Sequence, residues 1–212
     1  HHGKTPPCTQ ALIEAGVVRV VYGVADPGGD SGGGGEALAA AGIEVVGPVW
    51  STEVGRAENP AFFHTALHAS PFVALKLAMS LDAKISTAPG ARTRLTGVEA
   101  EREVHRLRSG FDAVMVGAGT LRADDPRLTP RRVPPGREPT RRIVLSSDAS
   151  IPADAALLKD ARAVPVHVFV GEEASESAME LIESSGAFVH PLPMVGTGLD
   201  LGALLDVCWE MG

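Results

Sequence analysis

Short apolar runs alternate with helix-like amphipathic stretches along most of the chain. Strands are predicted at residues 17–24, 43–46, 113–116, 142–145, 164–170 and 188–190. Helices are predicted at residues 8–15, 36–41, 96–110, 175–185 and 199–212. The run at residues 72–80 is also strongly apolar, and we expect a half-buried strand there that Lys76 interrupts. This alternation favours an α/β fold with a largely parallel sheet.

Residues that favour turns and helix ends locate the boundaries of these elements. Residues 51–69 read as a helical connector in which Asn59-Pro60 breaks or begins a helix, so we place a domain boundary between residues 1–69 and 70–212. Thr96 and Glu99 have capping-box spacing, which predicts a helix start near Thr96. The stretch 117–120 (Gly-Ala-Gly-Thr) closes a strand, either as a tight turn or as a loop that lets a phosphate approach, and 124–126 (Asp-Asp-Pro) predicts a turn.

Composition narrows the classes of function. Hydrophobic residues make up 44% and charged residues 21%, as in globular proteins, and the formal charge of −7 argues against non-specific nucleic-acid binding. The sequence contains no run long enough to span a bilayer and no apolar signal-peptide core, so we expect a cytoplasmic protein without a membrane partner. The two cysteines suit a reducing compartment. Both ends look cut, and we expect a fragment of a longer protein.

Several polar residues have both a functional and an ordinary interpretation. Cys8 follows Pro-Pro at a helix start, where it can be a metal thiolate or a semi-buried cysteine. Lys76 can be functional or can snorkel from an edge strand. Arg108 can bind an anion or compensate a helix dipole, Asp124 can be a turn residue, and Arg131 can belong to a solvated basic loop. The full dinucleotide and triphosphate glycine motifs are absent from the sequence.

Longer stretches carry a family resemblance. Residues 1–8 (His-His-Gly-Lys-Thr-Pro-Pro-Cys), with the strand Val18-Arg19-Val20-Val21 and Asp26-Pro27 after them, resemble the zinc motif of riboflavin-pathway deaminases. Residues 72–84, 95–97, 104–108, 112–120 and 124–131 are similar, in order and spacing, to the reductase domain of the same bifunctional riboflavin-biosynthesis deaminase/reductase family. The resemblance implies the end of a cytidine-deaminase-like domain followed by the first part of a dihydrofolate-reductase-like domain.

The resemblance assigns roles residue by residue. It makes Cys8 the last zinc ligand, but the other three functional groups of that motif are missing, so we do not expect this chain to bind catalytic zinc or to deaminate. It places Lys76 and Asp124 near the reacting carbon. The resemblance implies that NADPH is contacted by Ala78, Arg94, Thr120, Asp124 and Ser147. It implies that a phosphoribosyl pyrimidine is contacted by Arg92, Arg108, Leu128 and Arg131.

Some positions depart from the family pattern. Ala83 replaces a usual Gly, Arg92 and Arg94 stand where Ser and Trp are typical, and Ser146 stands where Asp is common. An Arg in place of Trp loses an aromatic face but can still stack or pair with a phosphate, so affinity is expected to change. The family's later Glu-Gly-Gly segment would lie beyond Gly212.

Three functions follow from these observations. The first is NADPH-dependent reduction of 5-amino-6-(5-phosphoribosylamino)uracil to its ribityl product, with deamination in the complete protein. The second is a noncatalytic remnant or assembly module, which Arg92, Arg94 and the missing zinc half-site motivate. The third is a reductase of the same fold that acts on another pterin-like or pyrimidine substrate. The choice between NADPH and NADH stays open, as does a homo-oligomer, which the resemblance suggests.

Overall fold

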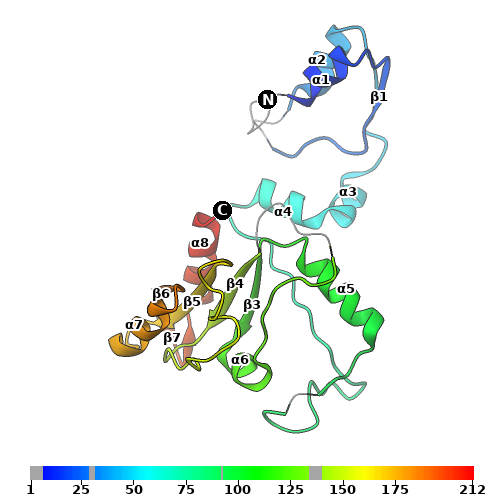
Figure 1. The fold of residues 1–212 in the computed structure, drawn as a ribbon. Coiled ribbons are helices and arrows are strands. Elements are labelled where there is room, and N and C mark those ends of the chain that lie inside the picture. Colours follow the sequence, from blue (N-terminus) through cyan, green and yellow to red (C-terminus); the bar gives the residue numbers. More distant parts are fainter. Residues whose placement is uncertain (1–6, 29–31, 92, 134–139) are drawn as a thin grey trace. The chain divides into compact units, whose positions relative to one another are not determined.

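The computed structural model describes residues 7–28, 32–91, 93–133 and 140–212, and they form two compact units (Figure 1). Unit 1 comprises His1–Ala74 with Cys208–Gly212, and unit 2 comprises Leu75–Val207. The domain boundary expected after residue 69 stays a prediction. No helix among the described residues is long and apolar enough to cross a bilayer.

Unit 1 is a small α/β arrangement. Its elements are α1 (Cys8–Glu14), β1 (Arg19–Val21), α2 (Gly34–Ala40), β2 (Glu44–Val46), α3 (Thr52–Glu58) and α4 (Pro60–Leu67). Strands β1 and β2 pair in parallel, with Arg19 opposite Glu44. The chain does break at Asn59, because α3 ends there and the Asn59 side chain accepts a hydrogen bond from the Phe62 backbone N–H to begin α4.

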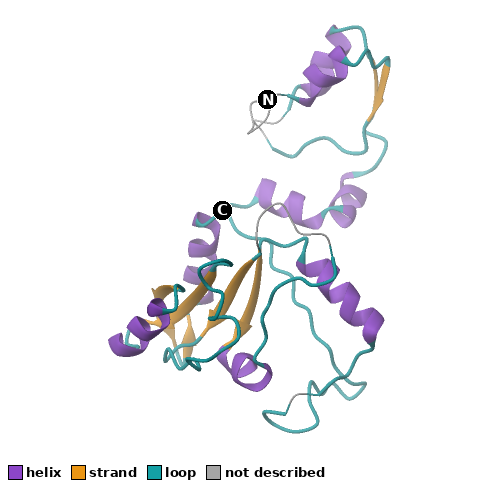
Figure 2. Ribbon diagram, viewed as in Figure 1, coloured by secondary structure: helices purple, strands orange, loops and turns teal. Residues whose placement is uncertain are grey.

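Unit 2 is built on a four-stranded sheet (Figure 2). Its strands β3 (Ala113–Gly117), β4 (Arg141–Leu145), β5 (Val166–Gly171) and β6 (Phe188–Leu192) lie side by side in that order and are all parallel. The other elements are α5 (Val98–Arg108), α6 (Ala118–Asp124), α7 (Glu176–Ser184), the hairpin β7 (Met194–Val195) and β8 (Gly198–Leu199), and α8 (Leu201–Glu210), which crosses the unit boundary. The prediction of an α/β fold with a largely parallel sheet is confirmed.

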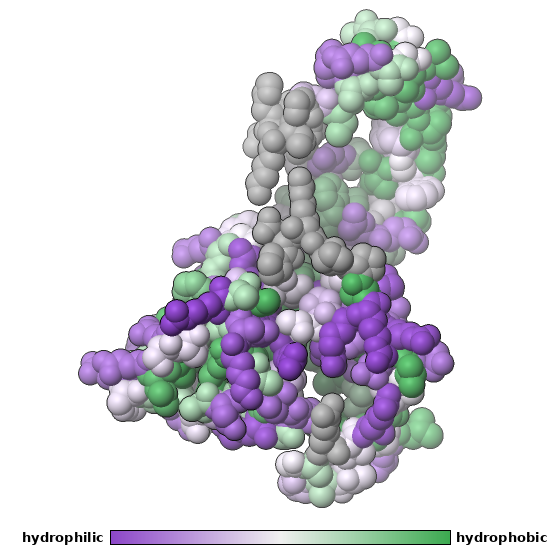
Figure 3. Space-filling view, viewed as in Figure 1, coloured by the Kyte–Doolittle hydropathy of each residue, from purple (hydrophilic) through white to green (hydrophobic). Residues whose placement is uncertain are grey.

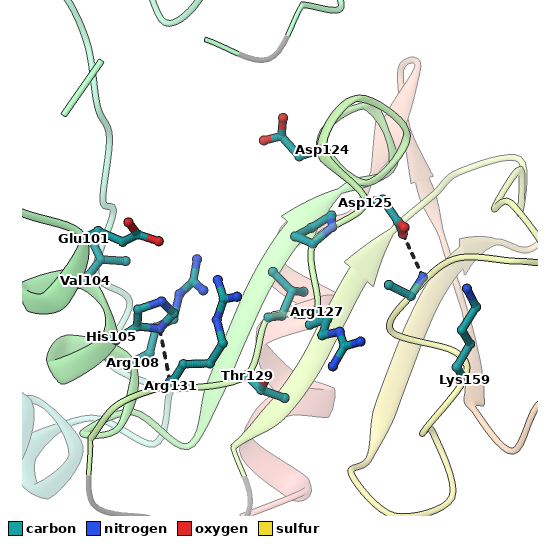
Figure 4. Close-up of a pocket in the computed structure, with 13 residues that line it drawn as sticks. Glu101, Val104, His105, Arg108, Asp124, Asp125, Arg127, Thr129, Arg131 and Lys159 are labelled. Carbon is teal, nitrogen blue, oxygen red and sulfur yellow. Dashed lines mark hydrogen bonds between the residues drawn. The ribbon is translucent and has the colours of Figure 1, made fainter. Parts of the chain in front are cut away.

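The core of unit 2 covers both faces of its central strands. All six residues of β5 are buried, which is why this strand reads as a nearly continuous apolar run. On one face, Val144 and Val168 pack with Leu121 of α6 and Ile182 of α7. The other face buries Phe169, and α8 passes behind the sheet in Figures 1 and 4.

The prediction of a strand at residues 72–80 is wrong. These residues have no regular secondary structure, and Leu75 and Leu77 are 83% and 57% exposed. A strand needs a hydrogen-bonded neighbour, and none of the described strands pairs with this run. Lys76 is therefore exposed instead of half-buried.

Three local predictions also need correction. The first helix of unit 2 begins at Val98 with Gly97 as its N-cap, and no side chain caps it, so the capping box at Thr96 does not form. The stretch after β3 is neither a tight turn nor an open loop, because Gly117 caps the helix α6 directly. Burial of Leu121 in the core stabilises this helix despite Gly119. Of the turn expected at residues 124–126, Asp124 instead ends α6, and Asp125 caps this helix in a left-handed conformation.

Candidate functional site

A cavity of about 580 Å³ opens in unit 2 between α5, the end of α6 and the loop that follows α6 (Figure 4). Figure 3 shows mainly hydrophilic residues over α5. The lining residues carry several charges: they are Glu101, Val104, His105, Arg108, Asp124, Asp125, Pro126, Arg127, Leu128, Thr129, Arg131, Ala156 and Lys159. Four cationic side chains and three carboxylates are among these residues, and the cationic part of the wall suits a small anionic ligand.

The structure brings four of the predicted site residues to this one cavity. Arg108 is the last residue of α5 and Asp124 the last of α6, while Leu128 and Arg131 lie on the following loop. They come from two helices and one loop, and Asp124 lies across from Arg108 and Arg131 (Figure 4). Their individual roles stay predictions.

Two arginines form the cationic wall of the cavity. The guanidinium groups of Arg108 and Arg131 point the same way, with Asp124 across from them (Figure 4). Burial, followed by the charge of Arg131, lowers the pKa of Arg108. The two like charges repel each other, and a bound anion would relieve that repulsion. Arg108 also lies in the last turn of α5, where a cation complements the helix dipole, and its anion-binding role stays a prediction.

The loop along the cavity is held in a strained conformation. Asp125, Leu128 and Arg132 all have positive φ values, of 40°, 58° and 59°. Each such residue costs on the order of 1 kcal/mol, so the surroundings must fix the loop. The Asp125 carboxylate accepts a hydrogen bond from the Ala156 backbone N–H at 2.7 Å, and the Leu128 side chain is 2% exposed. The loop is therefore anchored at its start and packed at its centre.

Two further residues of this region were not predicted from the sequence. His105 of α5 is 5% exposed, and its Nδ1 accepts a hydrogen bond from the Arg131 backbone N–H at 3.2 Å. Its spacing of three from Arg108 puts both on one helix face, which is a signal that could have identified it. Arg142 of β4 is fully buried and donates to the Arg127 carbonyl at 3.5 Å. Nothing in the strand pattern marks Arg142 as an anchor.

Thr120 and Ser147 lie at a different place, the carboxyl edge of the sheet. Gly117 ends β3 opposite Leu145 of β4, so the segments that carry Thr120 and Ser147 leave the sheet at the same edge. A Cβ added at Gly117 or Gly119 would meet no heavy atom within 4 Å, which leaves open space beside the first turn of α6. Carboxyl edges of parallel strands commonly bind nucleotides, and the cofactor-binding roles of Thr120 and Ser147 at this edge stay predictions.

The remaining predicted reductase residues lie outside the cavity lining. Lys76 is exposed and Ala78 half-buried, both on the irregular run that follows residue 71. Arg94 pairs with Glu101 through a 2.9 Å contact, and Glu101 itself lines the cavity. Arg92 lies outside the described residues.

Cys8 is the first residue of α1 and is exposed. In the part of the chain that the structure describes, no group of three or more His, Cys, Asp or Glu side chains is placed to hold a metal ion. The described residues therefore do not fit a zinc site, and we assign no chemical step to zinc.

Comparisons with known proteins agree on one family. The family model described as the RibD C-terminal domain matches residues 71–207. The riboflavin biosynthesis protein RibD of a Synechocystis species is 42% identical over 217 residues, which cover 100% of this chain and 58% of that protein. RibD of Mycobacterium tuberculosis (strain H37Rv) is 40% identical over 161 residues, covering 76% of this chain and 48% of the relative. The chain thus spans about half the length of these relatives.

Solved structures support the same assignment. The crystal structure of a diaminohydroxyphosphoribosylaminopyrimidine deaminase/5-amino-6-(5-phosphoribosylamino)uracil reductase from Thermotoga maritima is 31% identical, with a TM-score of 0.75, and the match covers 100% of this chain and 56% of that one. Acinetobacter baumannii RibD (form 1) is 27% identical, with a TM-score of 0.76 and the same coverage. From the sequence match over most of unit 2 and the shared fold, we conclude that this chain belongs to the RibD C-terminal domain family.

Proposed function

We propose that unit 2 carries the reductase step of riboflavin biosynthesis, the NADPH-dependent reduction of 5-amino-6-(5-phosphoribosylamino)uracil to its ribitylamino product. The Thermotoga relative has this reductase activity in its name. The observation that carries the proposal is the pair of guanidinium groups of Arg108 and Arg131, which face Asp124 across one cavity. A phosphoribosyl pyrimidine is an anion of a size that suits about 580 Å³.

The cavity residues would divide the work of binding and orientation. Arg108 and Arg131 would hold the phosphate through charge-assisted hydrogen bonds, and their positions on two elements would fix its direction. The buried Leu128 gives the cavity an apolar wall. Asp124, on the facing wall, would accept a hydrogen bond from a hydroxyl of the ribosyl chain and hold the reacting carbon in place. Lys76 is exposed, so this proposal places Asp124, and not Lys76, beside the reacting carbon.

Thr120 and Ser147 would hold NADPH at the carboxyl edge of the sheet, with Ala78 and Arg94 as further candidates. When bound, the nicotinamide supplies the hydride. The open space beside Gly117 and Gly119 supports this location, since neighbouring backbone can approach a phosphate or ribose without a side chain in the way. Arg94 can supply charge where family members have an aromatic ring, and it would have to leave its ion pair with Glu101 to do so.

Binding of the phosphoribosyl group can be tested with ribose 5-phosphate as the probe. Calorimetric titration of Arg108→Ala and Arg131→Ala should each show about tenfold weaker binding, because each removes one charge-assisted contact. Arg106→Ala is the matched control: Arg106 lies on the same helix, is exposed, pairs with Glu103 and does not line the cavity. A folded chain that does not bind the probe, or an Arg106→Ala loss as large as the other two, would refute the assignment of this cavity.

The cofactor needs a separate test. Fluorescence titration of NADPH against the chain and a Thr120→Ala variant, repeated with NADH, measures affinity and preference. Saturable NADPH binding that weakens in the variant supports the reductase. Lack of NADPH binding by folded protein contradicts a cofactor site within these residues.

Deamination is proposed only for a longer protein that supplies the other zinc ligands, with Cys8 as the last ligand. We also propose a cytoplasmic location, because the substrate and NADPH are small charged metabolites. A homo-oligomer remains part of the proposal that the family resemblance suggests.

A further inference from the structure

His105 lies at the boundary between two hollows of unit 2. It lines the cavity of about 580 Å³ and also a smaller one of about 180 Å³, together with Glu101 and Arg131. The residue is 5% exposed, although a histidine on a polar helix such as α5 would ordinarily face water. Burial of a polar ring is costly unless it is hydrogen-bonded, so its contacts indicate why it is kept inside.

The hydrogen bond of His105 joins the helix α5 to the strained loop along the cavity. The Arg131 backbone N–H donates to His105 Nδ1 at 3.2 Å, across 26 residues of sequence. Arg131 lies next to Arg132 and three residues after Leu128, both of which have positive φ values. The Asp125 contact with Ala156 anchors the beginning of this loop, and the His105 contact anchors its end.

The ring must be in one protonation state to make this contact. A ring nitrogen that accepts a hydrogen bond carries no proton, so Nδ1 is bare and a neutral ring has its proton on Nε2. Burial lowers the pKa of His105, and the positive charges of Arg131 and Arg108 lower it further. The smaller influences are Glu101, which raises the pKa, and Arg132, which lowers it. The arginines that form the cationic wall thus help keep the ring in the accepting form.

We propose that His105 is a positioning residue that holds the backbone of Arg131 so that the Arg131 side chain enters the cavity beside Arg108. The proposal rests on the proposed function, in which these two side chains bind the phosphate. Two guanidinium groups repel each other before an anion arrives, and Arg131 is at an exposed position from which it can swing into water. A backbone anchor to α5 opposes that movement and prepares the site for the anion.

A purely space-filling role for the ring makes a different prediction. His105→Asn offers an oxygen acceptor near the position of Nδ1, whereas His105→Leu fills a similar volume without an acceptor. Both variants lose the aromatic ring. If only packing matters, the Leu variant should preserve the loop better than the Asn variant. If the hydrogen-bond acceptor matters, the Asn variant should preserve it better.

The test uses the full chain and two measurements. The first is the hydrogen-exchange rate of the Arg131 backbone amide, and the second is the dissociation constant of ribose 5-phosphate. In His105→Leu we expect the amide to exchange about tenfold faster and the probe to bind about tenfold more weakly, while His105→Asn stays near the wild type in both. An unchanged amide in His105→Leu, or equal losses in Asn and Leu, would overturn the proposal.

A measurement on the unmodified protein covers the case in which His105→Leu does not fold. Nitrogen NMR of His105 at about pH 8 should show Nδ1 without a proton and Nε2 with one. A protonated Nδ1 would overturn the proposal. If the wild type does not bind ribose 5-phosphate, the proposed function fails, and the exchange rates alone then decide whether His105 anchors the loop.

Discussion

Replacing Arg142 with Met tests how the sheet holds the loops around the cavity. Arg142 lies on β4 and is 0% exposed. Its Nη1 donates to Asp160 Oδ1 at 2.6 Å and to the Arg127 carbonyl at 3.5 Å, and its Nη2 donates to the Val164 carbonyl at 2.5 Å. Its Nε–H has no hydrogen-bond partner among the described residues. One side chain therefore ties the strand to three places on the loops.

The magnitude follows from these contacts. Hydrogen bonds of a charged group contribute about 1.5–3 kcal/mol each, so the two short ones contribute about 3–6 kcal/mol. The contact at 3.5 Å adds little. Met also removes the unpaired Nε–H, whose burial costs about 1–3 kcal/mol. Because the Asp160 side chain is 44% exposed and can regain water, the loss should stay below that of a fully buried pair. We expect the free energy of unfolding to fall by about 2–3 kcal/mol.

Urea unfolding followed by circular dichroism measures this difference. The dependence of the free energy on urea should keep its slope, because the surface exposed on unfolding is nearly unchanged. Arg106→Met on the exposed side of α5 is the control and should change stability by less than about 0.5 kcal/mol. An Arg142→Met protein as stable as the wild type, or more stable, would show that desolvation of the guanidinium outweighs its hydrogen bonds, and the reasoning would be wrong.

Three other outcomes follow from the structure. The pKa of His167 is lowered to about 4, chiefly by burial, so the unfolded chain binds a proton between about pH 6.5 and 4 that the folded chain does not. The free energy of unfolding should therefore fall as pH drops through this window, by at most about 3 kcal/mol. Urea unfolding of His167→Phe at several pH values should lack this contribution. A pH profile of His167→Phe that is identical to that of the wild type would contradict the prediction. Gly186→Ala should lower the free energy of unfolding by about 1–2 kcal/mol, since Gly186 has φ +93° and a Cβ would lie 2.5 Å from Arg162 Cγ; calorimetry that shows no loss of stability refutes the clash. Asp125→Ala should release the Ala156 amide and weaken ribose 5-phosphate binding severalfold, and unchanged exchange at that amide would show that the loop is held elsewhere.

Local patterns predicted much of unit 2 because its strands are buried on both faces. Val166 and Val168 belong to a run that is apolar at nearly every position, which distinguishes a central parallel strand from an exposed one. The helix α6 was missed because Gly117 and Gly119 locally favour a turn, and it forms because Leu121 packs into the core. The run around Leu75 looks like a strand by composition, yet no described strand pairs with it.

The sequence by itself determined the α/β alternation, the net negative charge and the family resemblance that singled out Arg108, Asp124 and Arg131. Only the tertiary structure decided that these three residues line one cavity, because spacing along the chain carries no information on distances between groups held by different elements. The same is true of His105 and Arg142. Whether a polar side chain is buried depends on partners that fold against it from elsewhere in the chain, here the Arg131 amide and the Asp160 carboxylate.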